Sequence, residues 1–386
     1  MYRIKLYNNI SEKGLKLDKK LFESSATVND PDGIILRSHA LQEQEITTSV
    51  LAIARAGAGT NNIPVKACTP RGVVVFNTPG ANANAVRELV VCALYLSSRK
   101  IVQSIARVNE LKADPDIAKT AEKIKNEFVG PEINGKTLGL IGLGAIGSKV
   151  ANDADALGMH VLGYDPYLTV ENALTLTRNI QRVNSIDRII EEADYISLHL
   201  PLTDKTKGMV NAALINKMKN NVRILNFSRA EVVNNTDMVK AVETGKVACY
   251  ITDFAMPELM GKTNIVVIPH LGASTPEAEE NCAEMATAEL QDYLLNGNIT
   301  NSVNFPNVYL ERSGKPRITI INSNVPSIVE KISHTLAEHK ININEMINKS
   351  QQDIAYNIIE TDQDMSEPVI QKMKSLEGII RVRKIS

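Results

Sequence analysis

The chain has 386 residues, of which 44% are hydrophobic and 23% charged, a composition typical of a globular protein with two or three domains. Its 43 basic and 44 acidic residues give a formal net charge of −1, and no long run of one sign occurs. The sequence therefore lacks the basic surface expected of a nucleic-acid-binding protein. With 4% aromatic residues and no tryptophan, it also lacks the residues of a base-stacking platform.

The amino terminus reads MYRIKLYNNISEKG and lacks the apolar core of a signal peptide. No apolar run approaches the length that spans a bilayer. The cysteines are scattered, without a CxxC pair or metal-ligand spacing, which predicts reduced, mostly buried thiols. We therefore expect a cytoplasmic protein with no membrane partner and no metal site. The four cysteines are Cys68, Cys92, Cys249 and Cys282.

Two successive series of strand and helix patterns organise the first 300 residues. The first contains the strand-like stretches IILRSH, AIARAG and VVVFNTPG with helical segments between them, the clearest helix being Ala85 to Ser97. The second begins near residue 137 with TLGLIGLG and continues through VLGYDP, YISLHLP, RILNFS, YITDF and IVVIPH. Continuous apolar strands separated by helices predict two doubly wound parallel-sheet, Rossmann-like domains of the α/β class.

The remainder of the chain predicts a small third domain. A long helix from Pro276 to Leu295 ends at NGN, and a polar stretch with two prolines follows it as a linker. The last 70 residues then show the order βαββαβ of a ferredoxin-like domain. The apolar face of its first helix is predicted to comprise Val325, Ile328, Val329, Ile332 and Leu336.

The stretch GLGAIG at residues 142–147 matches the GxGxxG pattern of dinucleotide-binding loops. The pattern alone is a weak signal, but here an apolar strand precedes it, a helix follows it, and Asp165 ends the next strand at about the expected distance of 20 residues. Gly142 permits the tight turn, Gly144 lets the backbone approach a pyrophosphate, and Gly147 lets helix and strand pack closely. The Asp165 carboxylate can bind ribose hydroxyls and repels a 2′-phosphate, which favours NAD over NADP.

Three later strand ends carry polar side chains, namely Arg229 in NFSRAE, Glu258 in DFAMPE and His270 in IPHLGAST. Ligands of open α/β sheets bind at the carboxyl ends of the strands. Histidine is suited to proton transfer near neutral pH, a paired glutamate would fix its ring, and arginine offers a fork for a carboxylate. The alternative is that His270 is a core residue and that Arg229 and Glu258 are ordinary surface charges.

These stretches, together with LHLPLT, ARAGAGTNNI and NTPGANANAVREL, resemble the D-isomer-specific 2-hydroxyacid dehydrogenase family over roughly residues 30–300. The resemblance implies NAD as cofactor, a discontinuous first domain, an active site between two domains, and Arg229, Glu258 and His270 as the catalytic set. The implied cofactor-binding residues are Gly142, Gly144, Ala145, Ile146, Gly147, Asp165, His199, Pro201, Ser228 and Asp253. The implied substrate-binding residues are Arg37, Ser38, Arg55 and Gly57, with the two arginines near a substrate phosphate unless they are salt-bridge partners.

The last 70 residues resemble an ACT domain, a regulatory module that binds amino acids at paired interfaces. This resemblance implies a homo-oligomer, a dimer or a tetramer, and a possible L-serine site, unless the domain serves only assembly. The residues implied for that regulatory ligand are Asn322, Asn324 and Asn342.

A family member with such a tail is expected to oxidise 3-phospho-D-glycerate to 3-phosphohydroxypyruvate with NAD, the first step of L-serine biosynthesis. The rival expectation is another D-2-hydroxyacid substrate, of the glycerate/hydroxypyruvate or D-lactate type, and a more distant one is a non-catalytic NAD-sensing scaffold. The expected domains are a substrate-binding domain at 1–97 and 274–303, an NAD-binding domain at 98–273, a linker at 304–316 and an ACT-like domain at 317–386.

Overall fold

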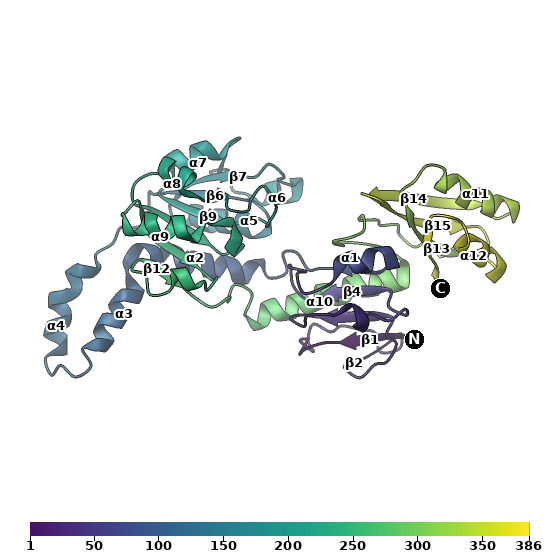
Figure 1. Ribbon diagram of the computed structural model, residues 1–386, viewed down its shortest axis with the longest axis horizontal. Helices are drawn as coiled ribbons and strands as arrows, with labels where there is room; N and C mark the ends of the chain where they lie inside the picture. Colours follow the sequence, from purple (N-terminus) through teal and green to yellow (C-terminus); the bar gives the residue numbers. More distant parts are fainter. Residues whose placement is uncertain (386) are drawn as a thin grey trace. The chain divides into compact units, whose positions relative to one another are not determined.

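The computed structural model describes residues 1–385 and contains three β-sheets (Figure 1). The chain divides into two compact units, one formed by Met1–Asn82 with Pro276–Ser386 and the other by Ala83–Thr275. The first unit contains a parallel sheet and the C-terminal antiparallel sheet, and the second contains the largest sheet. The α/β class predicted from the strand and helix patterns is confirmed.

The first sheet is parallel and has the strand order β2-β1-β3-β4-β5. Its strands are β1 (Tyr2–Leu6), β2 (Phe22–Ser25), β3 (Gly33–Leu36), β4 (Ala52–Arg55) and β5 (Val74–Phe76). The connections between these strands contain only short helical pieces, η1 (Glu43–Glu45), α1 (Val65–Cys68) and η2 (Thr69–Arg71), whereas the helix predicted at Ala85–Ser97 is present as α2 (Ala83–Arg99).

The long helix α10 (Pro276–Asn296) covers this first sheet and follows the predicted bounds within one residue. Glu277 and Glu279 lie in its first turn, where carboxylates interact favourably with the helix dipole. The helix ends at Gly297, whose φ of 77° lies in the left-handed region that favours glycine. Helix α10 contributes Ala286, Leu290 and Leu294 to the buried core beneath it.

The second sheet has seven parallel strands in the order β12-β11-β10-β9-β6-β7-β8. This order places the first strand, β6, next to the point where the direction of winding reverses, as in dinucleotide-binding domains. The strands are β6 (Thr137–Ile141), β7 (His160–Tyr164), β8 (Gln181–Arg182), β9 (Tyr195–Leu198), β10 (Val222–Asn226), β11 (Val247–Thr252) and β12 (Ile265–Val267).

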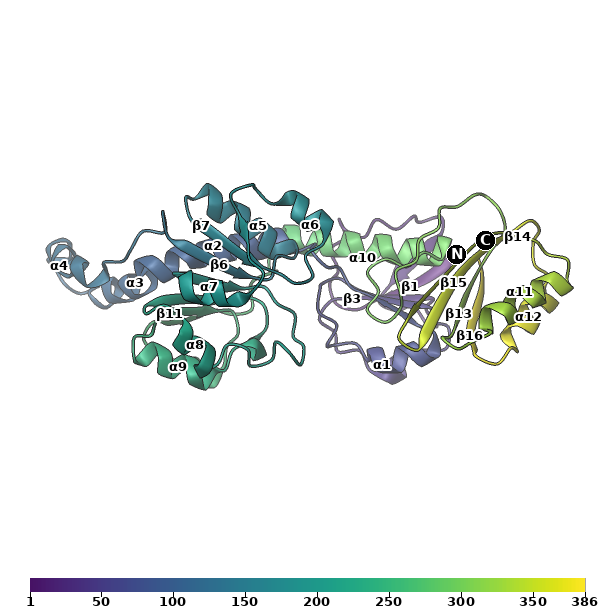
Figure 2. The same ribbon diagram turned by 90° about the horizontal axis from the view of Figure 1, so that it is seen from above.

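Helices flank the second sheet, and two of them extend away from it as a hairpin, α3 with α4 (Figure 2). The helices are α2 (Ala83–Arg99), α3 (Ile101–Glu110), α4 (Ile117–Ile124), η3 (Lys125–Phe128), α5 (Ala145–Ala156), α6 (Val170–Thr175), α7 (Ile186–Glu192), α8 (Ala212–Lys217), η4 (Ala230–Val232), α9 (Asn235–Glu243) and η5 (Pro257–Leu259). Within residues 1–385 no one helix has the length and apolarity to cross a membrane, and only the bent pair of α2 and α3 meets those two criteria together.

The division between the units falls earlier in the sequence than the expected boundary at residue 97. Helix α2 belongs to the second unit because Val86, Val90 and Leu94 pack into the same core as Leu140 and Val150. An amphipathic pattern identifies the helix but does not show which of two sheets receives its apolar face.

The C-terminal domain has an antiparallel sheet of order β14-β15-β13-β16, which is the ferredoxin-like arrangement predicted from the βαββαβ order. Its elements are β13 (Arg317–Ser323), α11 (Ile328–Glu338), β14 (Ile343–Gln351), β15 (Ile354–Thr361), α12 (Glu367–Lys374) and β16 (Ile379–Ile385). In α11, Ile328, Ile332 and Leu336 are buried as expected. Val325 is exposed because it precedes the helix, and Val329, in the first turn, is exposed beside an open cavity.

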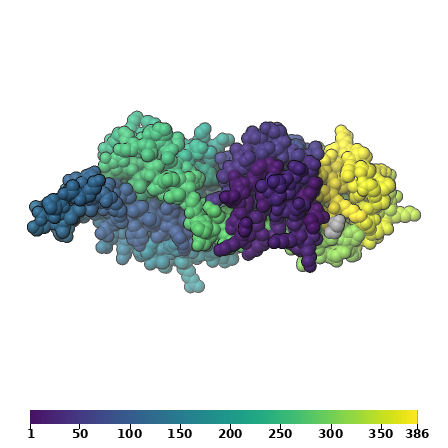
Figure 3. Space-filling model, turned by 90° about the horizontal axis from the view of Figure 1, so that it is seen from below, coloured from purple at the N-terminus to yellow at the C-terminus, as the bar shows by residue number. Residues whose placement is uncertain are grey.

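One face of the C-terminal sheet packs against the N-terminal part of the first unit. The two parts lie side by side in Figure 3, coloured yellow and purple. Ile321, Tyr356 and Ile358 share one buried core with residues of the first sheet and of α10, and the Tyr356 hydroxyl donates a 2.6 Å hydrogen bond to Gly297 O. The expected linker also packs here, since Phe305 and Val308 are fully buried. The C-terminal domain is therefore a packed layer of the first unit.

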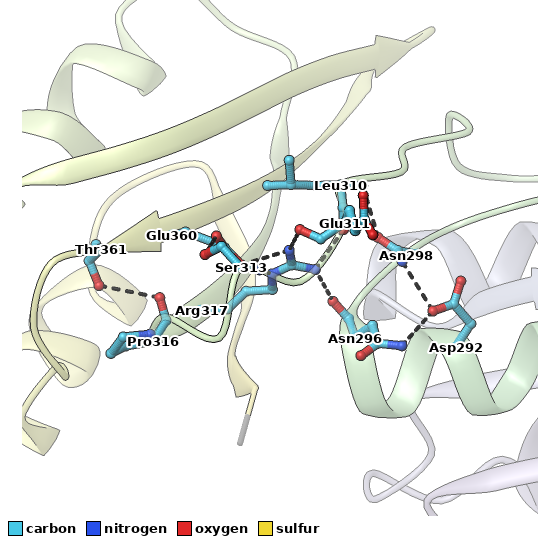
Figure 4. A network of polar contacts seen from close by, with 10 residues as sticks. All are labelled: Asp292, Asn296, Asn298, Leu310, Glu311, Ser313, Pro316, Arg317, Glu360 and Thr361. Atoms are coloured by element: carbon cyan, nitrogen blue, oxygen red, sulfur yellow. Dashed lines mark hydrogen bonds and ion pairs between the residues drawn. The ribbon is translucent and has the colours of Figure 1, made fainter.

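A buried ion pair fixes this attachment (Figure 4). Arg317 on β13 pairs with Glu360 on β15, and its guanidinium also donates to the carbonyls of Asn296, Leu310 and Glu311. These acceptors belong to the end of α10 and to the connecting segment. The Arg317 side chain thus connects the C-terminal sheet, the end of α10 and the segment between them.

Candidate active site

The glycine loop follows β6 and leads into α5 as predicted. Gly142 has φ 102°, and a Cβ atom there would lie 2.3 Å from His199 O. A Cβ at Gly147 would lie 2.1 Å from Gly142 O, so neither position accepts a larger residue without movement. A Cβ at Gly144 would meet nothing within 4 Å, which means that Gly144 borders open space in front of the loop.

The first turn of α5 provides an anion site for this loop. Gly144 is the N-cap residue and supplies no side-chain cap, so the amide groups of Ala145 and Ile146 have no acceptor from a capping side chain. Free amides and the positive end of the helix dipole suit a pyrophosphate. Together with the open space at Gly144, this arrangement fits the diphosphate of a dinucleotide.

Asp165 lies directly after β7, beside the glycine loop. Its carboxylate accepts hydrogen bonds from Leu143 N at 2.9 Å and from Tyr167 N at 2.8 Å. These backbone contacts hold one face of the carboxylate next to the loop that would carry the pyrophosphate. The remaining lone pairs are suited to two ribose hydroxyls.

His199 follows β9 and lies next to Gly142 of the glycine loop. Its ring lies 2.9 Å from Ser197 Oγ, and burial lowers its pKa to about 4, so that the imidazole is neutral at physiological pH. Pro201, two residues later, is exposed. The His199 carbonyl lies close to Gly142 and leaves no room there for a Cβ atom, so the backbone of this residue borders the glycine loop.

Arg229 is held at the carboxyl end of β10 by a turn built on Asn226. The fully buried Asn226 side chain donates to Arg229 O at 2.9 Å and accepts from Ser228 Oγ at 3.0 Å. The Arg229 guanidinium donates to Ser228 O at 2.7 Å through Nη1. Its other donors leave capacity for a carboxylate ligand.

His270 follows β12 and packs against Phe254, with ring centroids 5.1 Å apart in an edge-to-face arrangement. Asp253 is the carboxylate that lies close to it. Burial raises the pKa of Asp253 above its ordinary value, while the charge of His270, a hydrogen bond from Gly272 N and the charge of Arg229 oppose that rise. These electrostatic interactions place His270, Arg229 and Asp253 at one edge of the second sheet.

Asp253 also has an unsatisfied atom. Asp253 is only 2% exposed. Among residues 1–385, its Oδ1 is one of the buried side-chain atoms that have no hydrogen-bond partner. A buried carboxylate oxygen without a partner is costly unless a ligand donates to it. The amide N–H groups of a nicotinamide carboxamide are donors of the right kind.

Glu258 is positioned differently from the sequence-based expectation. Its Oε1 accepts a 3.1 Å hydrogen bond from Asn235 Nδ2 at the start of α9, and the side chain is exposed. In the part of the chain that the structure describes, no hydrogen bond or ion pair joins Glu258 to His270. The structure thus brings Asp253, and not Glu258, into electrostatic contact with the histidine.

The expected substrate residues of the first unit gather at the carboxyl ends of β3 and β4. Arg55 Nε donates to Arg37 O at 3.2 Å, and a Cβ on Gly57 would lie 2.2 Å from Arg55 Nη1. Gly57 has φ 151°, which a larger residue adopts only under strain. The Arg55 guanidinium therefore lies directly over the Gly57 backbone, an approach that only glycine permits.

Asparagine side chains hold the loop that carries Arg37. Asn62 donates to Arg37 O at 3.1 Å and to His39 O at 2.7 Å, and Asn8 accepts from the amides of Ser38 and His39. His39 pairs with Glu45 and stacks on Tyr7. It therefore belongs to the support of the loop.

The expected regulatory asparagines do not gather within one chain. Asn322 is fully buried and accepts from Asn357 Nδ2, whereas Asn324 lines an open cavity of about 380 Å³ at the head of α11. Asn342 precedes β14 at the Thr361 end of the sheet, and Asn324 lies near the Ile354 end. A single copy of the domain does not bring these two side chains together.

Several residues of these sites were not identified from the sequence. Asn226 and Asn62 act through backbone groups across tight turns, which a linear pattern does not reveal. Glu279 in the first turn of α10 forms an ion pair with Arg37, with Oε1 and Nη1 2.6 Å apart. Nothing in the sequence linked Glu279 to residue 37.

Comparisons with known proteins agree with this geometry. The family model described as "D-isomer specific 2-hydroxyacid dehydrogenase, NAD binding domain" matches residues 93–272. The D-3-phosphoglycerate dehydrogenase of Haemophilus influenzae is 31% identical over 365 residues, which cover 91% of this chain and 85% of that protein. The Escherichia coli D-3-phosphoglycerate dehydrogenase is 31% identical over 397 residues, covering 98% and 92% of the two chains.

Among solved structures, an NAD⁺-bound 3-phosphoglycerate dehydrogenase of Entamoeba histolytica matches with a TM-score of 0.62 and 28% identity. The match covers 80% of this chain and 99% of that one. The glycine loop, the open space at Gly144 and Asp165 fit the dinucleotide that this neighbour binds. The chain belongs to the D-isomer-specific 2-hydroxyacid dehydrogenase family and is an NAD-dependent oxidoreductase.

Proposed function

We propose that this chain oxidises 3-phospho-D-glycerate to 3-phosphohydroxypyruvate with NAD, the first step of L-serine biosynthesis. The observation that carries the proposal is the pair of guanidinium groups, Arg37 and Arg55, at the carboxyl edge of the first sheet. Two such groups suit a phosphate dianion. Similarity to D-3-phosphoglycerate dehydrogenases over nearly the whole chain supports the same substrate.

In the proposed reaction, an imidazole nitrogen of His270 accepts the proton of the C2 hydroxyl. Bound NAD supplies the acceptor for the C2 hydride. The Arg229 guanidinium binds the substrate carboxylate and polarises the C2 oxygen, and the backbone at Gly57 holds the other carboxylate oxygen. The Asp253 carboxylate stabilises the protonated imidazole through its charge, and its Oδ1 accepts a hydrogen bond from the carboxamide.

Within this proposal Glu258 has a smaller part than Asp253. Glu258 lies in η5, a few residues after Asp253, and its contact with Asn235 holds this segment. To orient His270, Glu258 would have to leave Asn235. We therefore assign the charge effect on His270 to Asp253 and a secondary orienting role to Glu258.

A substrate comparison tests the proposal. NADH oxidation is measured with phosphohydroxypyruvate, hydroxypyruvate and pyruvate, and kcat/KM is expected to be highest for the phosphorylated acid. Arg37→Ala should raise the KM for that acid at least tenfold, while Arg3→Ala, on an exposed position of β1, should not change it. Preference for an unphosphorylated acid would contradict the proposal.

One observation favours a second candidate, a glycerate/hydroxypyruvate-type dehydrogenase. The Arg37 charge is partly neutralised by Glu279, and a weakened positive charge is less suited to a phosphate. The substrate comparison separates the two candidates. A third outcome, tight NADH binding without turnover of any 2-oxo acid, would indicate an NAD-sensing scaffold.

A regulatory amino acid at the C-terminal domain is part of the proposal, with L-serine as the ligand. The cavity beside Asn324 supports it, since this cavity is also lined by Asn348, Ser327 and Glu330. Addition of L-serine should lower the initial rate, and Asn324→Ala should remove the inhibition. If L-serine has no effect at millimolar concentration, the domain serves assembly.

We also propose a homo-oligomer, a dimer or a tetramer, in the cytoplasm. Exposed apolar side chains on α3 and α4 support self-association, among them Ile101, Val102, Ile105, Val108 and Ile117. All four cysteines are unpaired thiols, which supports a reducing compartment. Light scattering during size-exclusion chromatography measures the mass of the protein in solution. A monomeric mass would contradict the proposed homo-oligomer.

A further inference from the structure

The ion pair between Arg37 and Glu279 lies inside the region proposed to bind the substrate phosphate. Arg37 directly follows β3, and Glu279 is in the first turn of α10. Their side chains are 33% and 39% exposed, so water and small ligands reach both. The Nη1 to Oε1 distance of 2.6 Å is that of a short, charge-assisted hydrogen bond.

The ion pair between Arg37 and Glu279 is part of a larger polar cluster. Arg55 Nε donates to Arg37 O at 3.2 Å. Thr78 follows β5, and its amide donates to Gly57 O at 3.1 Å. The ends of β3, β4 and β5 and the first turn of α10 therefore meet at one place, where the Glu279 carboxylate pairs with Arg37.

A carboxylate in this position competes with any anion that binds Arg37. The competition lowers the affinity for all anions, but it does so unequally. A phosphate dianion carries about twice the charge of a carboxylate and has three acceptor oxygens, so it can replace Glu279 on the guanidinium. A ligand whose far end is a neutral hydroxyl has no charge to offer Arg37 and leaves the ion pair intact.

We propose that Glu279 is a specificity-determining residue: it occupies Arg37 as an internal anion, which the distal phosphate of the substrate displaces. The inference rests on the proposed function and adds the residue that sets the affinity for the phosphorylated end. Glu279 touches neither the reacting carbon nor the nicotinamide in this scheme. Its effect is therefore on binding and not on the chemical step.

The test compares Glu279→Gln with the wild-type holoenzyme in the direction of NADH oxidation. The KM for phosphohydroxypyruvate should fall about two- to tenfold, because partly exposed ion pairs are weak and because a repulsive charge near the dianion is also removed. The inhibition constant of inorganic phosphate should fall by a similar factor. The KM for hydroxypyruvate and the kcat for both acids should stay within about twofold.

Glu277→Gln is the matched control, since Glu277 lies in the same first turn of α10, is exposed and undergoes the same change of charge. It should leave the KM for both acids unchanged. A double-mutant cycle with Arg37→Gln adds a second measurement: in the Arg37→Gln background, Glu279→Gln should have no further effect on the KM. This cycle remains informative if one single variant is poorly stable.

The outcomes separate the inference from the proposed function. If the wild type prefers phosphohydroxypyruvate but Glu279→Gln leaves its KM unchanged or raises it, the inference is wrong and the proposed function stands. If the wild type prefers hydroxypyruvate, the proposed function is wrong and the inference fails with it. An equal fall in KM for Glu277→Gln would also overturn the inference, because the effect would then be a general one of charge.

Discussion

The guanidinium of Arg317 donates two hydrogen bonds to the same oxygen of Glu360, at 3.0 Å from Nε and 2.7 Å from Nη2, and neither side chain is exposed. Burial raises the pKa of Glu360, but hydrogen bonds from Ser313 and Arg317 outweigh it, so the pKa lies below its ordinary value. A carboxylate with a lowered pKa in the folded state contributes stability at neutral pH that is lost as the pH falls through that pKa.

We expect Arg317→Met to lower the free energy of unfolding by about 3–5 kcal/mol, because it leaves the Glu360 charge buried and unpaired. The double variant Arg317→Met/Glu360→Leu should be less damaging than the single one, since no unpaired charge remains. Urea denaturation measures both. Lys384→Ala, which breaks an exposed ion pair with Asp364, is the control and should cost less than about 1 kcal/mol.

His270→Ala should lower kcat by about 10²- to 10⁴-fold, because the base that accepts the C2 hydroxyl proton is removed. The dissociation constant of NADH, measured by fluorescence, should change little, since the glycine loop lies on other strands of the sheet. Retention of near wild-type kcat would show that His270, which is exposed at a strand end, is not the base.

Asp253→Asn tests which carboxylate acts on His270. Loss of its negative charge removes a group that would stabilise the protonated imidazole during proton transfer, so kcat should fall about 10-fold or more. Glu258→Gln should lower kcat less, because the Glu258 side chain is bonded to Asn235. A larger loss of kcat with Glu258→Gln would restore Glu258 as the carboxylate paired with the histidine.

Gly144→Ala separates cofactor binding from folding. The added methyl group meets nothing in the protein, so the melting temperature should stay within about 2 °C of wild type. It does, however, lie where the pyrophosphate approaches the backbone, and the dissociation constant of NADH should rise at least tenfold. Gly142→Ala is the contrasting variant, since its Cβ clashes with His199 O and should lower the melting temperature itself.

Glu289 on α10 gives a prediction for the effect of pH on stability. Burial raises its pKa to about 8, while the 2.7 Å hydrogen bond from Asn301 acts in the opposite direction. Because the folded pKa lies above the unfolded value, the stability contributed by neutral Glu289 is complete below about pH 4.5 and is lost as the pH rises to about 8.

Glu289→Gln keeps an acceptor for Asn301 and removes the titration. Across that window, the wild type should lose up to about 1.4 kcal/mol per pH unit relative to the variant. Thermal unfolding at pH 6 and pH 8.5 measures the difference, with Glu280→Gln, on a solvent-accessible position of α10, as the control. An equal pH dependence of wild type and Glu289→Gln would contradict this account.

The second sheet was predicted well because its signals are local. Each strand is a continuous apolar run, and the glycine loop combines a turn, a helix start and Asp165 within one short segment. The helix predicted at Ala85–Ser97 is present as α2, but the short helical turns between the strands of the first sheet were not predicted, because they are fixed by packing of residues such as Ile46 and Cys68 into a core with the strands. Sequence periodicity does not report packing of that kind.

The sequence likewise identified some features of the candidate site and not others. Arg229 and His270 were identifiable because each directly follows a strand, at the edge where ligands bind. The pairing of Arg37 with Glu279 could not be identified from the sequence, because it depends on how α10 lies over the ends of β3 and β4. The proximity of Asp253 to His270 likewise depends on the register of β11 against β12, which alternating or apolar patterns leave open.

The shared core of the N-terminal and C-terminal sheets has a consequence for synthesis on the ribosome. Strands β1 to β5 emerge first, yet the residues that cover them, in α10 and in the C-terminal sheet, follow only after the whole of Ala83–Thr275. At about 5–20 residues per second, that delay is roughly 10–40 s. During this time the face of the strands that α10 covers lacks its packing partner, although the opposite face can pack on Leu41, Ile46 and Ile63. The uncovered face is therefore the surface of this segment for chaperones to protect.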